Sequence, residues 1–180
     1  MPFTTREEIR DNTEIVVVPI DMDRYLDFVV AAHRETFQIT FGSDITDAFL
    51  EDEIVRMRAN AAKDRYSVAG AFINDKIAGL TVLETRNRID SAQIGWIHFY
   101  YVSPSSRRMG VGLQLVKYSE AYFSALGLTE FCLRTGEYNQ TAIDFYMSTG
   151  FTRVPEEDRR GLNGVNELMM RFGIGSKDHS

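Results

Sequence analysis

The 180-residue chain has one cysteine, four prolines and three histidines. A single cysteine excludes an internal disulfide. Cys132 lies in the apolar run 130–133, which favours a small buried residue on a strand over a nucleophile. His33, His98 and His179 are far apart in the sequence, and no Cys/His cluster exists. No metal site is therefore predicted.

Long apolar runs are also lacking. Nothing approaches 18 consecutive apolar residues, so no membrane span is expected. The first eight residues carry early acids and no apolar segment, which does not fit a secretory signal and favours a cytoplasmic protein. The formal net charge of −6 argues against nucleic acid as a partner and is compatible with a cationic amine.

What is present is the material of one ordinary globular domain. Hydrophobic residues make up 44% of the chain and aromatic residues 12%, enough for a sizeable core. With no linker or internal repeat, a single domain over residues 1–180 is expected. Residues 1–13 are predicted as an N-terminal arm and residues 173–180 as a flexible tail.

Hydrophobic periodicity predicts a mixed α/β chain. The three strands around 66–102 should form an antiparallel meander, with a hairpin turn at Asn74-Asp75. Such a mixture gives a sheet with helices on both faces. The expected strands are 14–20, 66–73, 76–84, 93–102, 130–133, 151–154 and 167–172. A first helix is expected to begin near residue 22, and three more are expected over roughly 45–62, 111–125 and about 139–149.

The turn at residues 107–112 delivers a strand into a helix. The first turn of a helix has unpaired N–H groups and the positive end of the macrodipole. Gly110 and Gly112 would let an anion approach these amides, and Arg107 and Arg108 add positive charge. The alternative is a turn that only connects the two elements. A P-loop is excluded because Leu113-Gln114 follow the last glycine, and a dinucleotide fingerprint fits poorly because Leu115 takes its third glycine position.

Residues 101–113, Tyr-Val-Ser-Pro-Ser-Ser-Arg-Arg-Met-Gly-Val-Gly-Leu, resemble the acetyl-CoA-binding motif of the GCN5-related N-acetyltransferases (GNAT), Arg/Gln-x-x-Gly-x-Gly/Ala. Residues 139–146, Asn-Gln-Thr-Ala-Ile-Asp-Phe-Tyr, followed by Gly150-Phe151, resemble the family's second motif, Asn-x-x-Ala-x-x-Phe-Tyr. The strong part of the resemblance covers residues 93–154. The N-terminal third agrees only in the order of its elements.

The resemblance implies the GNAT fold, with a mixed, mostly antiparallel sheet of about seven strands that splays between strands 4 and 5. It also implies that acetyl-CoA is the cosubstrate, with its pantetheine arm between the splayed strands. Backbone groups around Tyr100 and Val102 match the positions that bind this arm, and Asn139 matches a side chain near its end. Arg107, Arg108, Met109, Gly110, Val111, Gly112 and Leu113 match the pyrophosphate turn.

For the chemistry, the resemblance implies direct attack of an amine on the thioester in a ternary complex. Tyr146 matches the general acid at the coenzyme sulfur, or it is an aromatic anchor of its helix. His98 is the first candidate for general base because an unperturbed imidazole titrates near neutral pH, and Glu84 is the second. Both have ordinary structural alternatives.

The acceptor side is less defined. Trp96 shares a strand face with His98 and either walls the substrate site or belongs to the core. By analogy with the family, Phe37, Phe41 and Tyr66 line the acceptor side.

Two functions follow from these patterns. The first is N-acetylation of a primary amine of a small molecule, an amino acid or a protein. The alternative is a non-catalytic acyl-CoA-binding regulatory module. Retention of Asn139 and Tyr146 beside the turn favours catalysis. A homodimer is common in the family, but no residue of the sequence indicates one.

Overall fold

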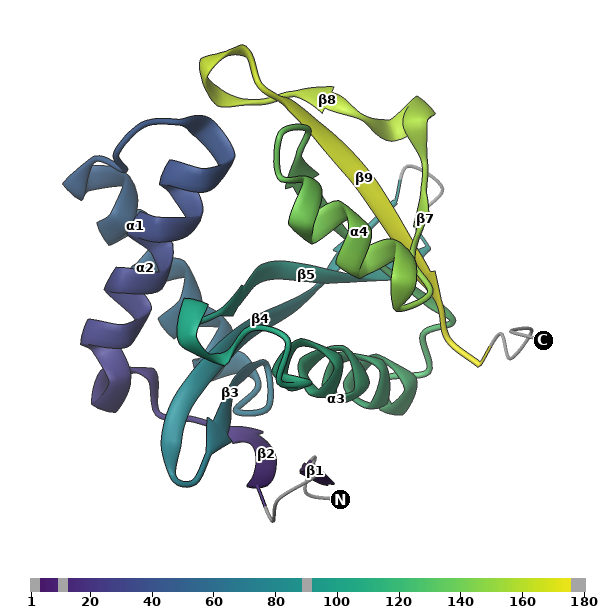
Figure 1. Ribbon diagram of the computed structural model, residues 1–180. Helices are drawn as coiled ribbons and strands as arrows, with labels where there is room; N and C mark the ends of the chain where they lie inside the picture. Colours follow the sequence, from purple (N-terminus) through teal and green to yellow (C-terminus); the bar gives the residue numbers. More distant parts are fainter. Residues whose placement is uncertain (1–3, 10–12, 89–91, 176–180) are drawn as a thin grey trace.

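The computed structural model describes residues 4–9, 13–88 and 92–175 (Figure 1). The described residues form a nine-stranded, mostly antiparallel sheet in the order β1-β2-β3-β4-β5-β6-β9-β7, with β8 paired to β9. The strands are β1 (Thr5–Ile9), β2 (Thr13–Pro19), β3 (Val68–Ile73), β4 (Lys76–Asn87), β5 (Gln93–Val102), β6 (Glu130–Gly136), β7 (Thr152–Arg153), β8 (Arg159–Arg160) and β9 (Asn166–Gly173).

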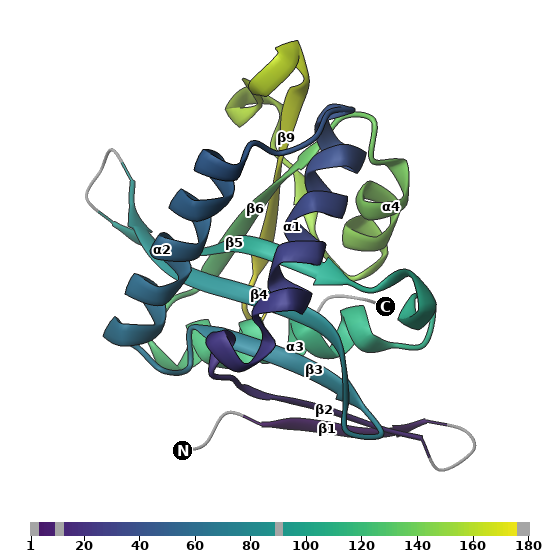
Figure 2. The same ribbon diagram turned by 90° about the vertical axis from the view of Figure 1, so that its left-hand side faces the viewer.

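Four α-helices accompany the sheet. They are α1 (Leu26–Phe41), α2 (Asp47–Lys63), α3 (Val111–Ala125) and α4 (Gln140–Ser148). In Figure 2, α1 and α2 lie in front of the sheet and α3 lies behind it. The core follows this division, because α3 and α4 contribute to one buried cluster with Tyr118, Phe123 and Tyr146, while α1 and α2 contribute to another with Val29 and Met57. Helices on both faces were predicted, and this is confirmed.

The meander β3-β4-β5 forms as predicted. Asn74 and Asp75 connect β3 to β4 with φ of 46° and 64°, the left-handed values that a two-residue type I′ hairpin needs and that Asn and Asp tolerate best after glycine. Gly95 of β5 has a packing role, because a Cβ there would lie 2.7 Å from atoms of Phe123 and Phe131.

Strands β5 and β6 diverge. They run parallel and pair only at Gly95 with Phe131 and at Trp96 with Cys132. Beyond this point β5 continues to Val102 and β6 to Gly136 without pairing to each other. The unpaired edge of each strand offers backbone N–H and C=O groups to a ligand. This confirms the predicted splay between the fourth and fifth predicted strands.

Some boundaries differ from the prediction. Residues 5–9, expected within a polar arm, pair with β2 as β1, and β8 was not predicted; these two raise the strand count from seven to nine. Strand β4 runs to Asn87 because it keeps its partner β5 as far as Gln93, so Glu84 lies inside the strand and does not end it. Of the expected tail, residues 176–180 lie outside the described residues, and Gly173 ends β9. None of the helices in the described part of the chain is long and apolar enough to span a membrane.

Candidate functional site

The predicted anion-binding turn lies at the start of α3. Gly110 is the N-cap of α3, with φ of 88°, a value that favours glycine. The first hydrogen bond that α3 makes to this cap runs from the Gln114 amide to the Gly110 carbonyl, 3.1 Å. The amides of Val111, Gly112 and Leu113 therefore have no acceptor within the helix and stand at its positive end. The residues present fit the diphosphate of a coenzyme.

Gly112 has a second role that the sequence did not show. The Tyr100 hydroxyl of β5 donates a 2.6 Å hydrogen bond to the Gly112 carbonyl. A Cβ at position 112 would stand 2.9 Å from this hydroxyl and 2.8 Å from the Phe145 ring of α4. Glycine at 112 therefore brings α3, α4 and the splayed strand β5 into contact.

The two arginines of the turn differ. Arg107 donates from Nε to the Val102 carbonyl at 3.1 Å and forms a 2.5 Å ion pair with Glu35 of α1. Glu35 also accepts a 2.6 Å hydrogen bond from the Tyr101 hydroxyl. Arg107 thus fixes the end of β5 against α1. Arg108 is exposed and has φ of 64°, and its guanidinium is the one that remains available to a phosphate.

Asn139 and Tyr146 belong to α4, on the same face as α3. The Asn139 side-chain oxygen caps α4 by accepting from the Ala142 amide at 3.2 Å, which leaves its NH₂ group for a ligand. Tyr146 is buried against Tyr100, with ring centroids 5.7 Å apart in an edge arrangement. Burial raises the pKa of Tyr146, so its hydroxyl keeps its proton at neutral pH.

His98 lies at an irregularity of β5. Strand β4 pairs Val82 with Phe99 and then Leu83 with Ile97, so His98 has no cross-strand partner and forms a β-bulge. The extra residue of a bulge changes the direction in which the side chains of that strand point. His98 Nε2 lies 2.6 Å from Glu53 Oε2 of α2, on the face opposite Tyr146, and both side chains are largely buried at 11% and 18% exposure.

Glu53 is held in its charged form. Burial alone would raise the pKa of the Glu53 carboxyl, but the hydrogen bond and charge of His98 outweigh it and lower the pKa. An ionised Glu53 fixes the orientation of the imidazole, as a carboxylate does beside a general base.

His33 interacts with the same carboxylate as His98. His33 and His98 are 65 positions apart in the sequence, but both interact electrostatically with Glu53 and with each other. His33 is buried, stacks on Phe99 at 3.9 Å between ring centroids, and places Nδ1 2.8 Å from the Val29 carbonyl. Within the described ranges, no group of three or more His, Cys, Asp or Glu residues is arranged to hold a metal. His179 lies outside these ranges.

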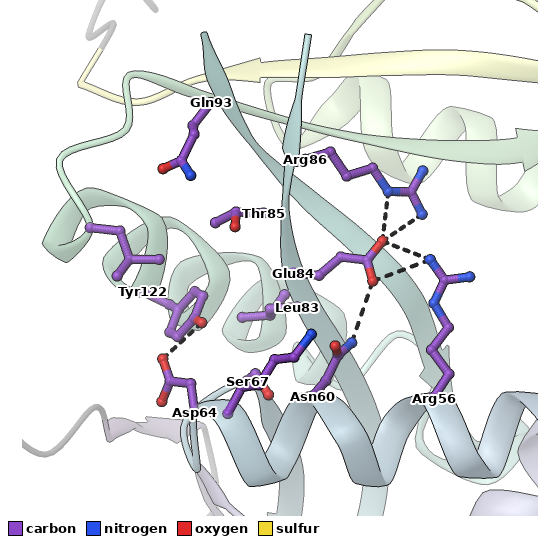
Figure 3. Close-up of a pocket in the computed structure, with 12 residues that line it drawn as sticks. Arg56, Asn60, Asp64, Ser67, Leu83, Glu84, Thr85, Arg86, Gln93 and Tyr122 are labelled. Atoms are coloured by element: carbon purple, nitrogen blue, oxygen red, sulfur yellow. Dashed lines mark hydrogen bonds and ion pairs between the residues drawn. The ribbon is translucent and has the colours of Figure 1, made fainter. Parts of the chain in front are cut away.

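Glu84, the second base candidate, is bound by two arginines. It forms ion pairs with Arg86 at 2.6 Å and with Arg56 of α2 at 3.1 Å (Figure 3). Burial alone would raise the pKa of the Glu84 carboxyl. The bond and charge of Arg86, followed by the electrostatic interactions with His98 and Arg56, outweigh burial and lower the pKa. These three side chains border a groove of about 520 Å³ that lies between α2 and the end of α3. A carboxylate held by two guanidinium groups is a weak proton acceptor.

Trp96 lies between two guanidinium groups. Arg86 lies over its ring at 3.8 Å and Arg134 of β6 at 5.2 Å. The indole belongs to a small buried cluster with Cys132 and Met169. Cys132 is fully buried and burial raises its pKa, which agrees with the prediction of a structural cysteine.

The three aromatic residues predicted for the acceptor side do not lie together. Phe37 packs against Phe41 and, across the α1–α2 connection, against Phe49 at 5.6 Å. Tyr66 instead packs against the cluster on the α3 face, and its carbonyl accepts a hydrogen bond from the Tyr118 hydroxyl. The aromatic wall at the α1–α2 connection therefore consists of Phe37, Phe41 and Phe49 without Tyr66.

Sequence reasoning missed three residues of this region: Glu35, Glu53 and Arg134. Each acts on a partner far along the chain, as Glu35 does on Arg107. No local signal in the sequence pairs Glu53 with His98, because the two residues lie 45 positions apart.

Comparison with known proteins agrees with this geometry. The Acetyltransferase (GNAT) family matches residues 26–151. An aminoglycoside N(6')-acetyltransferase type 1 from Klebsiella aerogenes is 36% identical over 66 residues, which is 37% of this chain and 43% of the relative. The chain thus matches less than half the length of this curated relative.

Two solved structures show the same fold. The GNAT domain of PAT from S. lividans has a TM-score of 0.68, with 17% identity over 95% of this chain and 97% of that one. The PaiA N-acetyltransferase from Thermoplasma acidophilum, solved with coenzyme A, has a TM-score of 0.64, with 15% identity over 88% of this chain and 98% of that one.

Acetyl-CoA is the acetyl donor of the matched family, which confirms the predicted cosubstrate. The match covers both motif segments, the turn at 107–112 and the helix at 139–146, and the splayed sheet that joins them. The chain belongs to the GNAT acetyltransferase family.

Proposed function

We propose that the chain is an N-acetyltransferase that transfers the acetyl group of acetyl-CoA to a primary amine by direct attack in a ternary complex. The observation that carries the proposal is the position of two proton-transfer groups on opposite faces of one splayed strand. Tyr146 packs on the α3 face of β5, and His98 bonds Glu53 on the α2 face. Beyond Trp96 and Cys132, β5 and β6 no longer pair, so a pantetheine arm bound to the free edge of β5 would have access to both groups.

In this arrangement the α3 side binds acetyl-CoA. The amides from Met109 to Leu113 and the Arg108 guanidinium bind the diphosphate, and the free edge of β5 around Tyr100 and Val102 binds the pantetheine arm. Asn139 binds near the end of that arm through its NH₂ group. Arg107 acts through its bonds to Val102 and Glu35, which hold the strand end in place.

The acceptor enters from the α1–α2 side. His98, oriented by Glu53, takes a proton from the ammonium group, directly or through water, and the neutral amine attacks the thioester carbon. Tyr146 donates its proton to the departing sulfur. Holding both reactants in one gap supplies a large part of the rate enhancement. Glu84 is not assigned as the base, because Arg56 and Arg86 occupy its carboxylate.

The amine is a small molecule, an amino acid or a protein amino group. The aminoglycoside acetyltransferase relative supports a small-molecule amine, and the net charge of −6 favours attraction of an ammonium group. We also propose a cytoplasmic location. The alternative is a non-catalytic acyl-CoA-binding module. This alternative gives the His98–Glu53 pair no function.

The test is thiol release from acetyl-CoA over a panel of amines. We expect turnover with at least one amine, and His98→Gln should lower kcat by about 100-fold, the lower end of general-base contributions. Coenzyme binding without thiol release from any amine would favour the regulatory module. A control, Asp52→Asn, changes an exposed residue next to Glu53 on α2 and should leave kcat unchanged.

A further inference from the structure

Arg134 lies on β6 in the region where β6 has left β5. It is two residues beyond Cys132, the last β6 residue paired to β5, so it borders the gap between the splayed strands. Its guanidinium lies 5.2 Å from the centre of the Trp96 ring. Trp96 is two residues from His98, about 7 Å along an extended strand. Arg134 is thus in contact with the strand that carries the proposed general base, through Trp96.

The Arg134 side chain is only partly satisfied. Its NH2 nitrogen donates to the Glu157 carbonyl at 3.2 Å, and its Nε is buried with no hydrogen-bond partner. A buried donor without a partner costs free energy. No ion pair of Arg134 exists in the part of the chain that the structure describes.

The carboxylates nearby are already paired. Glu157 is bound by Arg171, and Glu167 by Arg159 at 2.5 Å. On the other side of Trp96, Glu84 is shared between Arg56 and Arg86, as Figure 3 shows. Arg86 and Arg134 therefore lie at the Trp96 ring, and Arg86 and Arg56 share the carboxylate of Glu84, the cross-strand partner of Trp96.

The charges near these arginines affect their pKa values. Burial first, and then the charge of Arg159, lower the pKa of Arg134, although the carboxylates of Glu167 and Glu157 oppose this effect. Burial also lowers the pKa of Arg86, and the charges of Arg56 and Arg134 add to this effect, although Glu84 opposes it. Cations held together in this way are stabilised by an anion that binds between them.

We propose that the acceptor amine carries an anionic group, a carboxylate or a phosphate, and that Arg134 binds this group. The inference rests on the proposed N-acetyltransferase function and names the substrate class of that site. A guanidinium presents two parallel N–H groups that match carboxylate or phosphate oxygens. The acceptor is then zwitterionic, with its ammonium at the His98–Glu53 pair and its anionic group at Arg134. A polycationic aminoglycoside does not fit this arrangement.

The test compares matched acceptors that differ only in the anion. Glycine is paired with glycinamide, O-phosphoethanolamine with ethanolamine, and kanamycin serves as the polycation. We expect kcat/KM, corrected for the neutral amine fraction, to be about tenfold or more higher for one anionic member of these pairs than for its neutral partner. The two pairs separate a carboxylate acceptor from a phosphate acceptor.

Arg134→Gln should remove this preference by raising KM for the anionic member of each pair. Arg134→Lys keeps the charge without the paired N–H groups and should restore the preference only in part. Arg65→Gln, an exposed arginine on the other side of the sheet, is the control. The proposal is overturned if neutral amines or kanamycin are used equally well or better, or if Arg134→Gln weakens all acceptors alike.

A binding measurement keeps this test independent of turnover. Glycine and O-phosphoethanolamine are titrated calorimetrically into the protein saturated with CoA. Heat of binding that is present in the wild type and lost in Arg134→Gln supports the anion site. If this heat is observed but no thiol is released from any amine, the anion site stands and only the proposed acetyltransferase function fails. If neither compound binds and neutral amines are turned over, the anion site is contradicted and the proposed acetyltransferase function stands.

Discussion

The Tyr100 hydroxyl donates to the Gly112 carbonyl at 2.6 Å and lies 2.9 Å from the point where a Cβ at position 112 would stand. One hydroxyl therefore both fixes the first turn of α3 and excludes a side chain from it. The contact connects the proposed coenzyme turn to the strand that the acceptor approaches from the other face.

Gly112→Ala should therefore destabilise the fold and displace the coenzyme turn. The added methyl would press on Tyr100 and Phe145, and overpacking of this kind costs about 1–3 kcal/mol. Urea unfolding measures the change. Tyr100→Phe removes the contacting hydroxyl, so the cost of Gly112→Ala should be smaller in that background. Strict additivity of the two substitutions would contradict the proposed contact.

Tyr146→Phe tests the proposed general acid. The ring packs against Tyr100 and Phe151, and the structure records no hydrogen bond for the Tyr146 hydroxyl within the described chain. Packing and the Kd for acetyl-CoA should thus be retained, whereas kcat should fall by about 100-fold. Single-turnover thiol release and calorimetry separate the two quantities. If turnover is unchanged, Tyr146 is only an anchor of α4.

Glu53→Gln tests the bond to His98 through the pH dependence of stability. The folded-state pKa of Glu53 lies below its ordinary value of 4.5, so its stabilisation is fully present above about pH 4.5 and is lost as pH falls through the folded pKa. The free energy of unfolding of the wild type should exceed that of Glu53→Gln by about 1.5–3 kcal/mol at neutral pH, the range for hydrogen bonds to charged groups.

This difference should shrink steadily once the pH falls below about 4.5. Urea unfolding from pH 7 to pH 3 measures it, with Asp52→Asn on the same helix as the charge control. A difference between wild type and Glu53→Gln that stays constant over the whole range would exclude an ionised Glu53 as the partner of His98.

Glu35 and Arg107 should show a modest, salt-dependent coupling. Their side chains are 30% and 41% exposed, so the pair is partly screened by solvent. A double-mutant cycle with Glu35→Gln and Arg107→Gln should give a coupling of up to about 1 kcal/mol at low salt, and less at high salt. Zero coupling at low salt would mean that the ion pair does not hold the turn.

The elements with local signals were predicted from the sequence. The apolar stripe from Val111 to Ala125 forms α3 with these bounds, and residues 93–102 form β5 with theirs. Asn74-Asp75 forms the hairpin turn because the two residues tolerate positive φ. Each of these signals lies within a few residues of the element that it specifies.

Other features depend on partners that the local sequence does not reveal. The bulge at His98 arises from the register of two strands, and the chain around it reads as a regular strand. The same holds for the bond between His98 and Glu53, which lie 45 positions apart, and for β1, whose polar sequence gains its partner only from β2. The proposed catalytic residues could be suggested from motifs, but their supporting carboxylates could not.

Glu35 belongs to α1, beside the proposed acceptor entrance, yet it holds Tyr101 and Arg107 at the end of β5. An acceptor that shifts α1 on binding would change the affinity for acetyl-CoA through this carboxylate. By thermodynamic reciprocity, acetyl-CoA would then change the acceptor affinity by the same factor. The coupling between the two substrates would thus depend on a single ion-paired side chain, remote from the reacting atoms.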